Sequence, residues 1–177
     1  MDISPMDNVI GLLSTASGQY FGEDVTQLEH ALQCAYLARA AGAEEDVVLA
    51  ALLHDIGHLV AEGDELGNPD HDQLGATYLE SLGYGGTLVE LVAQHVQAKR
   101  YLTATNPEYL ARLSVASRQT LELQGGPMTP EEAAEFAEHP LFRDVLRLRA
   151  WDEEAKVPEL PIDGLEFYRE MLDRQLR

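Results

Sequence analysis

The sequence predicts an all-α protein that folds as a single helical bundle domain over residues 1–177. Three observations support this fold class. Apolar residues recur at helical spacing in several segments, glycine- and proline-containing stretches separate these segments, and no segment keeps the alternating pattern of a strand. The length is that of one ordinary domain, and we find neither an internal repeat nor a linker.

The first half of the chain predicts four helices and one long loop. Residues 27–41 place apolar side chains at i, i+3 and i+4 spacing. Residues 44–56 are apolar nearly all round, which is typical of a buried helix. Residues 61–70 have the composition of a loop, and helices at 71–82 and 85–98 follow it.

The second half predicts shorter elements after Lys99. A turn is expected at 124–127, and Thr129 followed by Pro130 is a typical helix start, with the threonine as cap. Further helices are expected at 107–113, 115–123, 140–154 and 163–176.

The charge of the chain limits its partners. With 31 acidic and 12 basic residues, the formal net charge is −19. Such a surface repels nucleic acid and anionic membranes, so we expect neither as a partner. An anionic substrate would need basic residues close to its site. The chain lacks a long apolar run and a basic signal segment, and its one cysteine, Cys34, is expected to be buried; we therefore expect a cytoplasmic protein.

Histidine and aspartate supply the most specific pattern in the sequence. The pair His54-Asp55 ends an apolar helix, where an imidazole and a carboxylate are costly to bury unless they are paired or bound to metal. Because the two side chains leave the helix about 100° apart, the carboxylate can bridge two ions while the imidazole binds one. The candidate metal ligands are His30, His54, Asp55, His71, His95 and Asp152.

Any one of these residues alone is more often a core or surface group than a ligand. Their combination, from separate predicted helices, indicates a metal site, and imidazole and carboxylate ligands suit iron, manganese or zinc. His139 precedes a proline in an acidic stretch and is expected at the surface.

The pattern His30…His54-Asp55…Asp152 resembles the HD-domain superfamily, most of whose members are metal-dependent phosphohydrolases. From Gln19 to Lys156 the chain is more similar to its mixed-valence di-iron oxygenases, which share their ligand set with myo-inositol oxygenase, and above all to the phosphonate-cleaving group. The resemblance implies two iron ions, Fe(II) and Fe(III), with O2 as co-substrate.

The resemblance also implies roles around the metal centre. Tyr20 would cap an iron in the absence of substrate with Glu23 as its partner, although a loop tyrosine is ordinarily a packing residue. His58 would order the substrate or a ligand. Asp24 is a candidate contact for a substrate cation, or else an exposed loop acid.

An anion site is the other implication. Lys99 lies one helical turn after His95, and Arg149 lies at i−3 from Asp152, so each would bring a positive charge to the metal centre. By themselves such residues are usually exposed to solvent. The neutral donors that the resemblance places around a phosphonate share one helical face: Ser117, Thr120 and Gln124.

The resemblance therefore implies a di-iron oxygenase that cleaves the carbon–phosphorus bond of a small cationic 1-hydroxyphosphonate. The expected substrates are 2-amino- or 2-trimethylammonio-1-hydroxyethylphosphonate, and the products are phosphate and glycine or glycine betaine. Two alternatives remain: an HD-type phosphohydrolase acting on a nucleotide or phosphate ester, which would have no use for Tyr20 and Glu23, and a non-catalytic HD module. The sequence leaves the oligomeric state open.

Overall fold

The computed structural model describes residues 2–60 and 67–176. Within them the regular structure is helical, apart from an isolated antiparallel bridge between Gln19 and Thr26. The all-α prediction is therefore confirmed. The helices are α1 (Pro5–Ser14), α2 (Gln27–Ala40), α3 (Glu45–Leu53), α4 (Gly57–Val60), α5 (His71–Ser81), α6 (Gly86–Thr105), α7 (Pro107–Arg112), α8 (Val115–Leu123), α9 (Pro130–Ala137), α10 (Phe142–Glu154), the 3-10 turn η1 (Leu165–Tyr168) and α11 (Arg169–Arg174).

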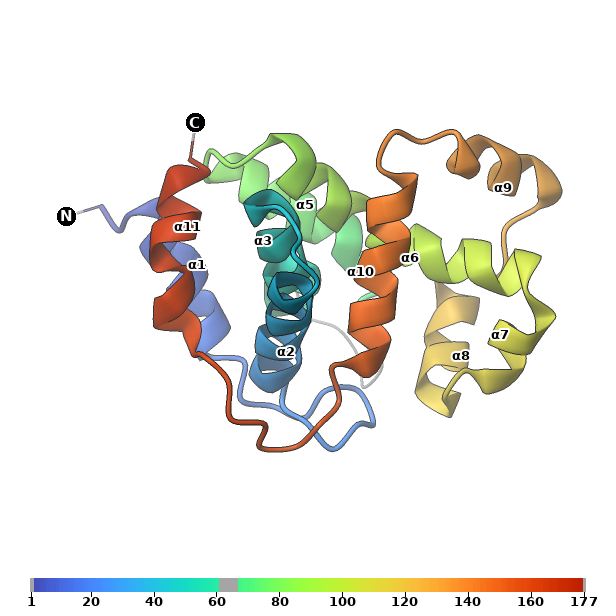
Figure 1. Ribbon diagram of the computed structural model, residues 1–177, viewed down its shortest axis with the longest axis horizontal. Coiled ribbons are helices and arrows are strands. Elements are labelled where there is room, and N and C mark those ends of the chain that lie inside the picture. Colours follow the sequence, from blue (N-terminus) through green and yellow to red (C-terminus); the bar gives the residue numbers. More distant parts are fainter. Residues whose placement is uncertain (1, 61–66, 177) are drawn as a thin grey trace.

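Helices α2, α3, α6 and α10 form the centre of the bundle. Helix α3 packs against α2 and α6, and α10 packs against all three of these helices. Residues Val47–Leu53 of α3 are all buried, as the continuous apolar run predicts. Figure 1 shows α1 and α11 together at one end of the bundle and the group α7–α9 at the other. The predicted ligands lie on or next to the central helices.

The predicted helix at 44–56 is interrupted in the structure. Helix α3 ends at Leu53 and α4 begins at Gly57, so His54 and Asp55 lie at the break. Gly57 permits the close approach of α4 to α5, because a Cβ atom at this position would lie 1.8 Å from the carbonyl oxygen of His71. The break and the glycine together bring Asp55 and His71 to the same place.

Other boundaries also differ from the predictions. Helix α6 continues to Thr105, because the first strong helix breaker after Lys99 is Pro107. The sequence analysis did not predict α1, although Ser4 caps it and Pro5 occupies its first turn. Thr129 does cap α9, as predicted, and forms a capping box with Glu132.

Two further predictions concern residues 61–70 and 163–176. The predicted loop at 61–70 lies outside the described residues over positions 61–66. The segment predicted as one helix at 163–176 consists of η1 and α11. Among the helices that the structure describes, none has the length and apolar character needed to cross a membrane.

Candidate metal centre and anion pocket

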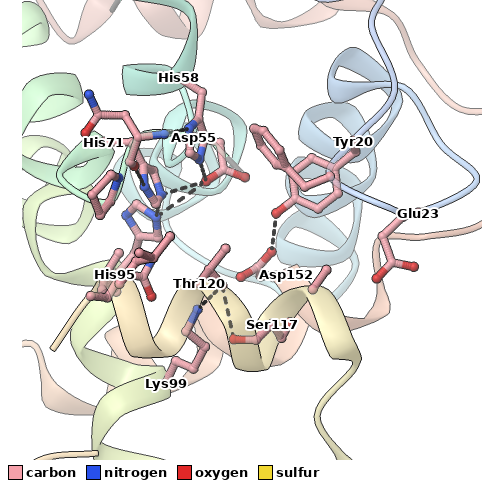
Figure 2. A pocket seen from close by; sticks show the side chains of 18 of the residues that line it. Tyr20, Glu23, Asp55, His58, His71, His95, Lys99, Ser117, Thr120 and Asp152 are labelled. Carbon is pink, nitrogen blue, oxygen red and sulfur yellow. Dashed lines mark hydrogen bonds and ion pairs between the residues drawn. The ribbon is translucent and has the colours of Figure 1, made fainter. Parts of the chain in front are cut away.

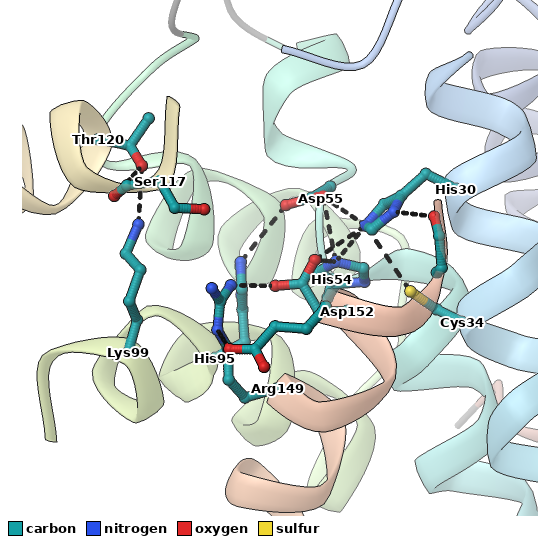
Figure 3. Close-up of polar contacts among 12 residues, drawn as sticks. His30, Cys34, His54, Asp55, His95, Lys99, Ser117, Thr120, Arg149 and Asp152 are labelled. Carbon is teal, nitrogen blue, oxygen red and sulfur yellow. Dashed lines mark hydrogen bonds and ion pairs between the residues drawn. The ribbon is translucent and has the colours of Figure 1, made fainter. Parts of the chain in front are cut away.

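The structure brings the six predicted metal ligands together in one buried region, and all of them except His71 are labelled in Figure 3. Five of the six residues are buried, and the Asp55 side chain is 18% exposed. They come from different parts of the bundle: His30 from α2, His54 and Asp55 from the turn after α3, His71 from the start of α5, His95 from α6 and Asp152 from α10.

Hydrogen bonds to the backbone fix the orientation of the four imidazoles. In each ring Nδ1 lies next to a carbonyl oxygen and must carry the proton to donate to it. A neutral ring with this tautomer presents the lone pair of Nε2, the arrangement common in metal-bound histidines. The four contacts are His30 to Ala155 at 2.9 Å, His54 to Ala51 at 2.7 Å, His71 to Asn68 at 2.9 Å and His95 to Val92 at 2.7 Å.

One donor cluster gathers around His30. Its Nε2 lies 3.3 Å from Nε2 of His54 and 3.0 Å from Oδ1 of Asp152. The Sγ atom of Cys34, which is buried as predicted, lies 3.7 Å from the same Nε2. Donor atoms of these four residues all lie within 4.8 Å of one another, which is close enough to surround one ion.

A second donor cluster gathers around His71. Its Nε2 lies 2.8 Å from Nε2 of His95 and 3.1 Å from Oδ1 of Asp55. The other carboxylate oxygen of Asp55, Oδ2, lies 3.0 Å from Nε2 of His54 in the first cluster. Asp55 therefore spans the two clusters, as its place in the sequence suggested.

The donor chemistry of both clusters fits metal cations. Oδ2 of Asp55 is buried and has no hydrogen-bond partner among the described residues, because the neighbouring Nε2 of His54 has no proton to donate in this tautomer. Lone pairs that face one another repel unless a cation lies between them.

His58 supports the second cluster from the side. Its ring stacks on that of His71 with the centroids 3.8 Å apart, and its Nε2 lies 3.8 Å from Oδ1 of Asp55. Its Nδ1 accepts a hydrogen bond from the backbone of Asn68. Burial and the neighbouring His71 lower the pKa of His58 to about 3, so the ring is neutral at physiological pH.

Tyr20 covers the first cluster. Its ring stacks on His30 with the centroids 3.9 Å apart, and its hydroxyl donates to Oδ1 of Asp152 at 3.4 Å. Figure 2 shows the phenol directed toward Asp152 across the pocket. Burial, followed by the charge of Asp152, raises the pKa of the Tyr20 phenol, which keeps the proton on its oxygen.

Glu23 lines the same pocket but is not bonded to Tyr20 through its side chain. Its carboxylate pairs with Lys156 at 3.0 Å, while its backbone N–H donates to the Tyr20 carbonyl in a tight turn. Asp24 follows in this turn and is exposed, outside the lining of the pocket. That Asp24 contacts a substrate cation therefore stays a prediction, and its exposure fits the alternative of a loop acid at the surface.

Basic and neutral polar groups line the wall opposite Tyr20. Lys99 is buried on α6, and its Nζ donates to Oγ1 of Thr120 at 2.8 Å. Ser117 and Gln124 line the pocket beside Thr120, so the polar face predicted for α8 does point inward. Oε1 of Gln124 is buried without a hydrogen-bond partner among the described residues. The pocket is partly open to solvent, so a small ligand can enter it from outside.

Arg149 joins the anion wall to the metal centre. Its Nη1 contacts Oδ2 of Asp152 at 2.6 Å, and its Nε donates to the Tyr109 hydroxyl at 2.8 Å. Burial would raise the pKa of the Asp152 carboxyl, but the charge of Arg149 lowers it well below its ordinary range. The guanidinium is therefore held in place and lines the pocket with its charge intact.

Several residues of the site were not predicted from the sequence. Lys156 lines the pocket from just beyond the end of α10, so helical spacing from Asp152 does not predict its place. Phe21, which packs on His58 at a centroid distance of 4.5 Å, carries no sequence signal either. His139, predicted at the surface, is partly exposed and pairs with Glu90 away from the pocket.

The chain is similar to known proteins of one family. Residues 28–149 match the family model described as HD domain. This range contains five of the six predicted ligands, and Asp152 follows shortly after it.

Three curated relatives are similar over most of the chain. Hydroxymethylphosphonate dioxygenase of Gimesia maris is 42% identical over 163 residues, covering 89% of this chain and 81% of the relative. (1-Hydroxy-2-(trimethylamino)ethyl)phosphonate dioxygenase (glycine-betaine-forming) of Leisingera caerulea is 40% identical, covering 89% and 83%. An uncharacterized protein of Acanthamoeba polyphaga mimivirus is 39% identical, covering 96% and 81%. The predicted resemblance to phosphonate-cleaving HD-domain oxygenases is confirmed.

Proposed function

Because the chain belongs to the HD-domain family, we propose that it is a di-iron oxygenase that cleaves the carbon–phosphorus bond of a small 1-hydroxyphosphonate with O2. The iron pair would be Fe(II) and Fe(III). The products would be inorganic phosphate and a carboxylic acid.

One observation carries this proposal: residues of both donor clusters line one pocket with the anion wall, and in this pocket Arg149 contacts Asp152 directly. A ligand held by the anion wall therefore lies next to both clusters. Phosphohydrolases of the family would use the same ligands to activate water. Two of the relatives are named as phosphonate dioxygenases, which favours the oxygenase.

The names of those two relatives suggest the substrate class. One is named for hydroxymethylphosphonate and the other for (1-hydroxy-2-(trimethylamino)ethyl)phosphonate. In both compounds a hydroxyl lies on the carbon that bears the phosphonate. We propose 2-amino- or 2-trimethylammonio-1-hydroxyethylphosphonate, which would give glycine or glycine betaine.

Different residues of the pocket would bind different groups of the substrate. Lys99 and Arg149 would bind the phosphonate oxygens, and the neutral donors of α8 would bind them from the other side. The hydroxyl and a phosphonate oxygen would replace the Tyr20 hydroxyl at the metal centre, with Glu23 released together with the tyrosine.

When bound, iron would supply the redox chemistry that O2 requires. His58 is neutral and stacks on His71, so it would keep the His71 imidazole oriented as a metal ligand.

The proposed reaction balances with dioxygen as the only oxidant. One hydroxyphosphonate dianion and one O2 give one carboxylate, one hydrogen phosphate and one proton. The carbon that bears the hydroxyl loses its bonds to hydrogen and phosphorus and becomes the carboxylate carbon. Holding the substrate at several points is the expected source of specificity.

The decisive experiment measures O2 consumption and phosphate release together. Protein purified anaerobically and loaded with iron is given hydroxymethylphosphonate, the 2-amino compound or the 2-trimethylammonio compound, each with and without O2. We expect equal amounts of O2 consumed and phosphate released with at least one of the three. Phosphate release from a phosphate monoester or nucleotide in the absence of O2 would instead identify a phosphohydrolase.

A further inference from the structure

A second, apolar cavity lies directly behind the metal centre. Its walls come from the end of α1, the first turns of α2, the junction of α3 and α4 and the loop that carries Tyr20. The apolar residues that line it include Leu13, Ala16, Ala31, Leu52, Ile56 and Leu59. All but Leu59 are at most 5% exposed, so the cavity is built from core side chains.

Four residues line both this cavity and the anion pocket: Tyr20, Phe21, Asp55 and His58. They form the partition between the two spaces. Asp55 is the residue that spans the donor clusters, so the apolar cavity reaches the metal centre itself. Figure 2 shows Tyr20, Asp55 and His58 around the pocket side of this partition.

The two spaces differ sharply in polarity. Among the described residues, three cations (Lys99, Arg149 and Lys156) and three carboxylates line the anion pocket, which suits charged ligands and water. Apart from the partition, Gln27 supplies the one polar side chain that lines the cavity in the part of the chain that the structure describes. A cavity of this kind stays dry and takes small apolar molecules rather than water.

We propose that this apolar cavity binds dioxygen and leads it to the metal centre from the side away from the phosphonate. The inference rests on the proposed function, since only an oxygenase needs this co-substrate. Dioxygen is small and uncharged, so it enters an apolar cavity without the desolvation cost that a phosphonate would meet there. A hydroxyphosphonate in the anion pocket would block the other approach.

The position of Tyr20 gives the proposal a further consequence. Its ring separates the cavity from the first donor cluster and covers that cluster through its contacts with His30 and Asp152. When a substrate displaces the phenol, the cavity, which already meets Asp55, opens toward the first donor cluster as well. Dioxygen would then reach the site after the substrate, which limits oxidation of the protein itself.

A binding measurement tests the cavity without any turnover. Crystals of the metal-loaded protein are pressurised with krypton, an apolar probe similar in size to dioxygen, and its anomalous signal is located. We expect krypton between Leu13, Ala16 and Leu52. Absence of krypton from this cavity in the wild-type protein would overturn the proposal.

A kinetic measurement tests the route. Ala16→Val adds two methyl groups to the cavity wall, and Leu59→Phe narrows the same cavity from α4. Both should raise the KM for O2 several-fold, while the KM for the hydroxyphosphonate and the kcat at saturating O2 stay unchanged. Ala76→Val is the matched control, because Ala76 is similarly buried on α5 but lines neither space. An unchanged KM for O2 in both folded cavity variants would show that dioxygen takes another route.

The two proposals fail in different ways. If the wild-type protein consumes no O2 with any hydroxyphosphonate, the proposed function is wrong. If it does consume O2 but the cavity variants behave like Ala76→Val, the function stands and the inferred dioxygen cavity is wrong.

Discussion

Asp55 is the residue on which the two donor clusters depend, because each of its carboxylate oxygens faces a different cluster. The sequence already suggested this role from the position of the residue at the end of an apolar helix. Asp152 differs, since one of its oxygens faces the first cluster and the other contacts Arg149.

Asp55→Ala should therefore impair both metal sites, whereas Asp152→Ala should impair mainly the site at His30. Metal content per chain after iron loading and desalting measures this difference. Asp144→Ala, on the same helix as Asp152 but paired with Arg147 at the surface, is the control and should retain the full metal content. Equal metal loss in the Asp55 and Asp152 variants would contradict a bridging role.

Arg149→Ala should weaken phosphonate binding while iron is retained. A charge-assisted hydrogen bond contributes roughly 1.5–3 kcal/mol, so we expect an increase in Kd of about 10- to 150-fold. Titration calorimetry with methylphosphonate and metal analysis give the two readouts. The matched control is Arg147→Ala, whose side chain is 43% exposed on the same helix. Loss of iron at unchanged affinity would mean that Arg149 serves Asp152 rather than the substrate.

Lys99 predicts a dependence of anion binding on pH. Burial and the nearby Arg149 lower the pKa of Lys99 to about 7 in the free pocket. Below this pH the lysine carries its charge and attracts the anion, and above it the charge is lost. Affinity for methylphosphonate should fall as pH rises from about 7 to 9, and Lys99→Met should flatten this fall. A pH dependence that persists in the variant would assign it to another group.

At the scale of elements, the break between α3 and α4 is what positions the His-Asp pair. A continuous helix over 44–56 was the natural prediction, because its apolar residues run without interruption through Leu53. Instead, the helix breaks after Leu53, and Gly57 then lies against the backbone of His71. A contact between two separate segments leaves no signal in the local periodicity of the sequence.

Gly57→Ala should be strongly destabilising, since its new methyl group would overlap the His71 carbonyl oxygen. We expect a loss of roughly 3 kcal/mol or more in the free energy of unfolding, measured by urea denaturation. Gly11→Ala is the control: a Cβ there meets nothing within 4 Å, and alanine should stabilise α1 by about 0.5–1 kcal/mol. Similar effects of the two substitutions would contradict the close approach of α4 and α5.

The entrance loop shows a second limit of local patterns. Tyr20 and Glu23 were expected to act together, yet Glu23 pairs with Lys156 from beyond α10. The same turn directs Asp24 outward. These directions follow from backbone bonds such as Tyr20 N–H to the Val25 carbonyl, which residue types alone do not indicate.

For the whole molecule, the net charge of −19 makes the arrangement of cations important. The chain concentrates Lys99, Arg149 and Lys156 in one pocket, which corrects the field where an anion would bind. The donor clusters lie beneath this pocket and between the central helices, so a bound cation would hold those helices together.

Removal of metal should therefore lower the thermal stability of the whole domain. A ligand present at 100 times its Kd stabilises the folded state by about 2.7 kcal/mol, which corresponds to roughly 5–10 °C in Tm for a chain of this size. Scanning calorimetry of the iron-loaded and chelator-treated protein measures the shift. The Asp55→Ala variant should show little response to the chelator, and a full response would place the stabilising metal elsewhere.

The sequence by itself determined the all-α fold, the residue types of the metal centre and the resemblance to HD-domain oxygenases. These follow from helical periodicity, from the His-Asp pair after an apolar helix, and from short motifs whose geometry is local. Spacing within one helix also placed Lys99 near His95 and Arg149 near Asp152.

Only the tertiary structure decided how these parts meet. The two-cluster arrangement around Asp55, the pairing of Glu23 with Lys156, the outward turn of Asp24 and the apolar cavity behind Tyr20 all depend on contacts between distant segments. Such contacts are fixed by the packing of α2, α3, α6 and α10 around a common core, which the periodicity of a single helix does not specify.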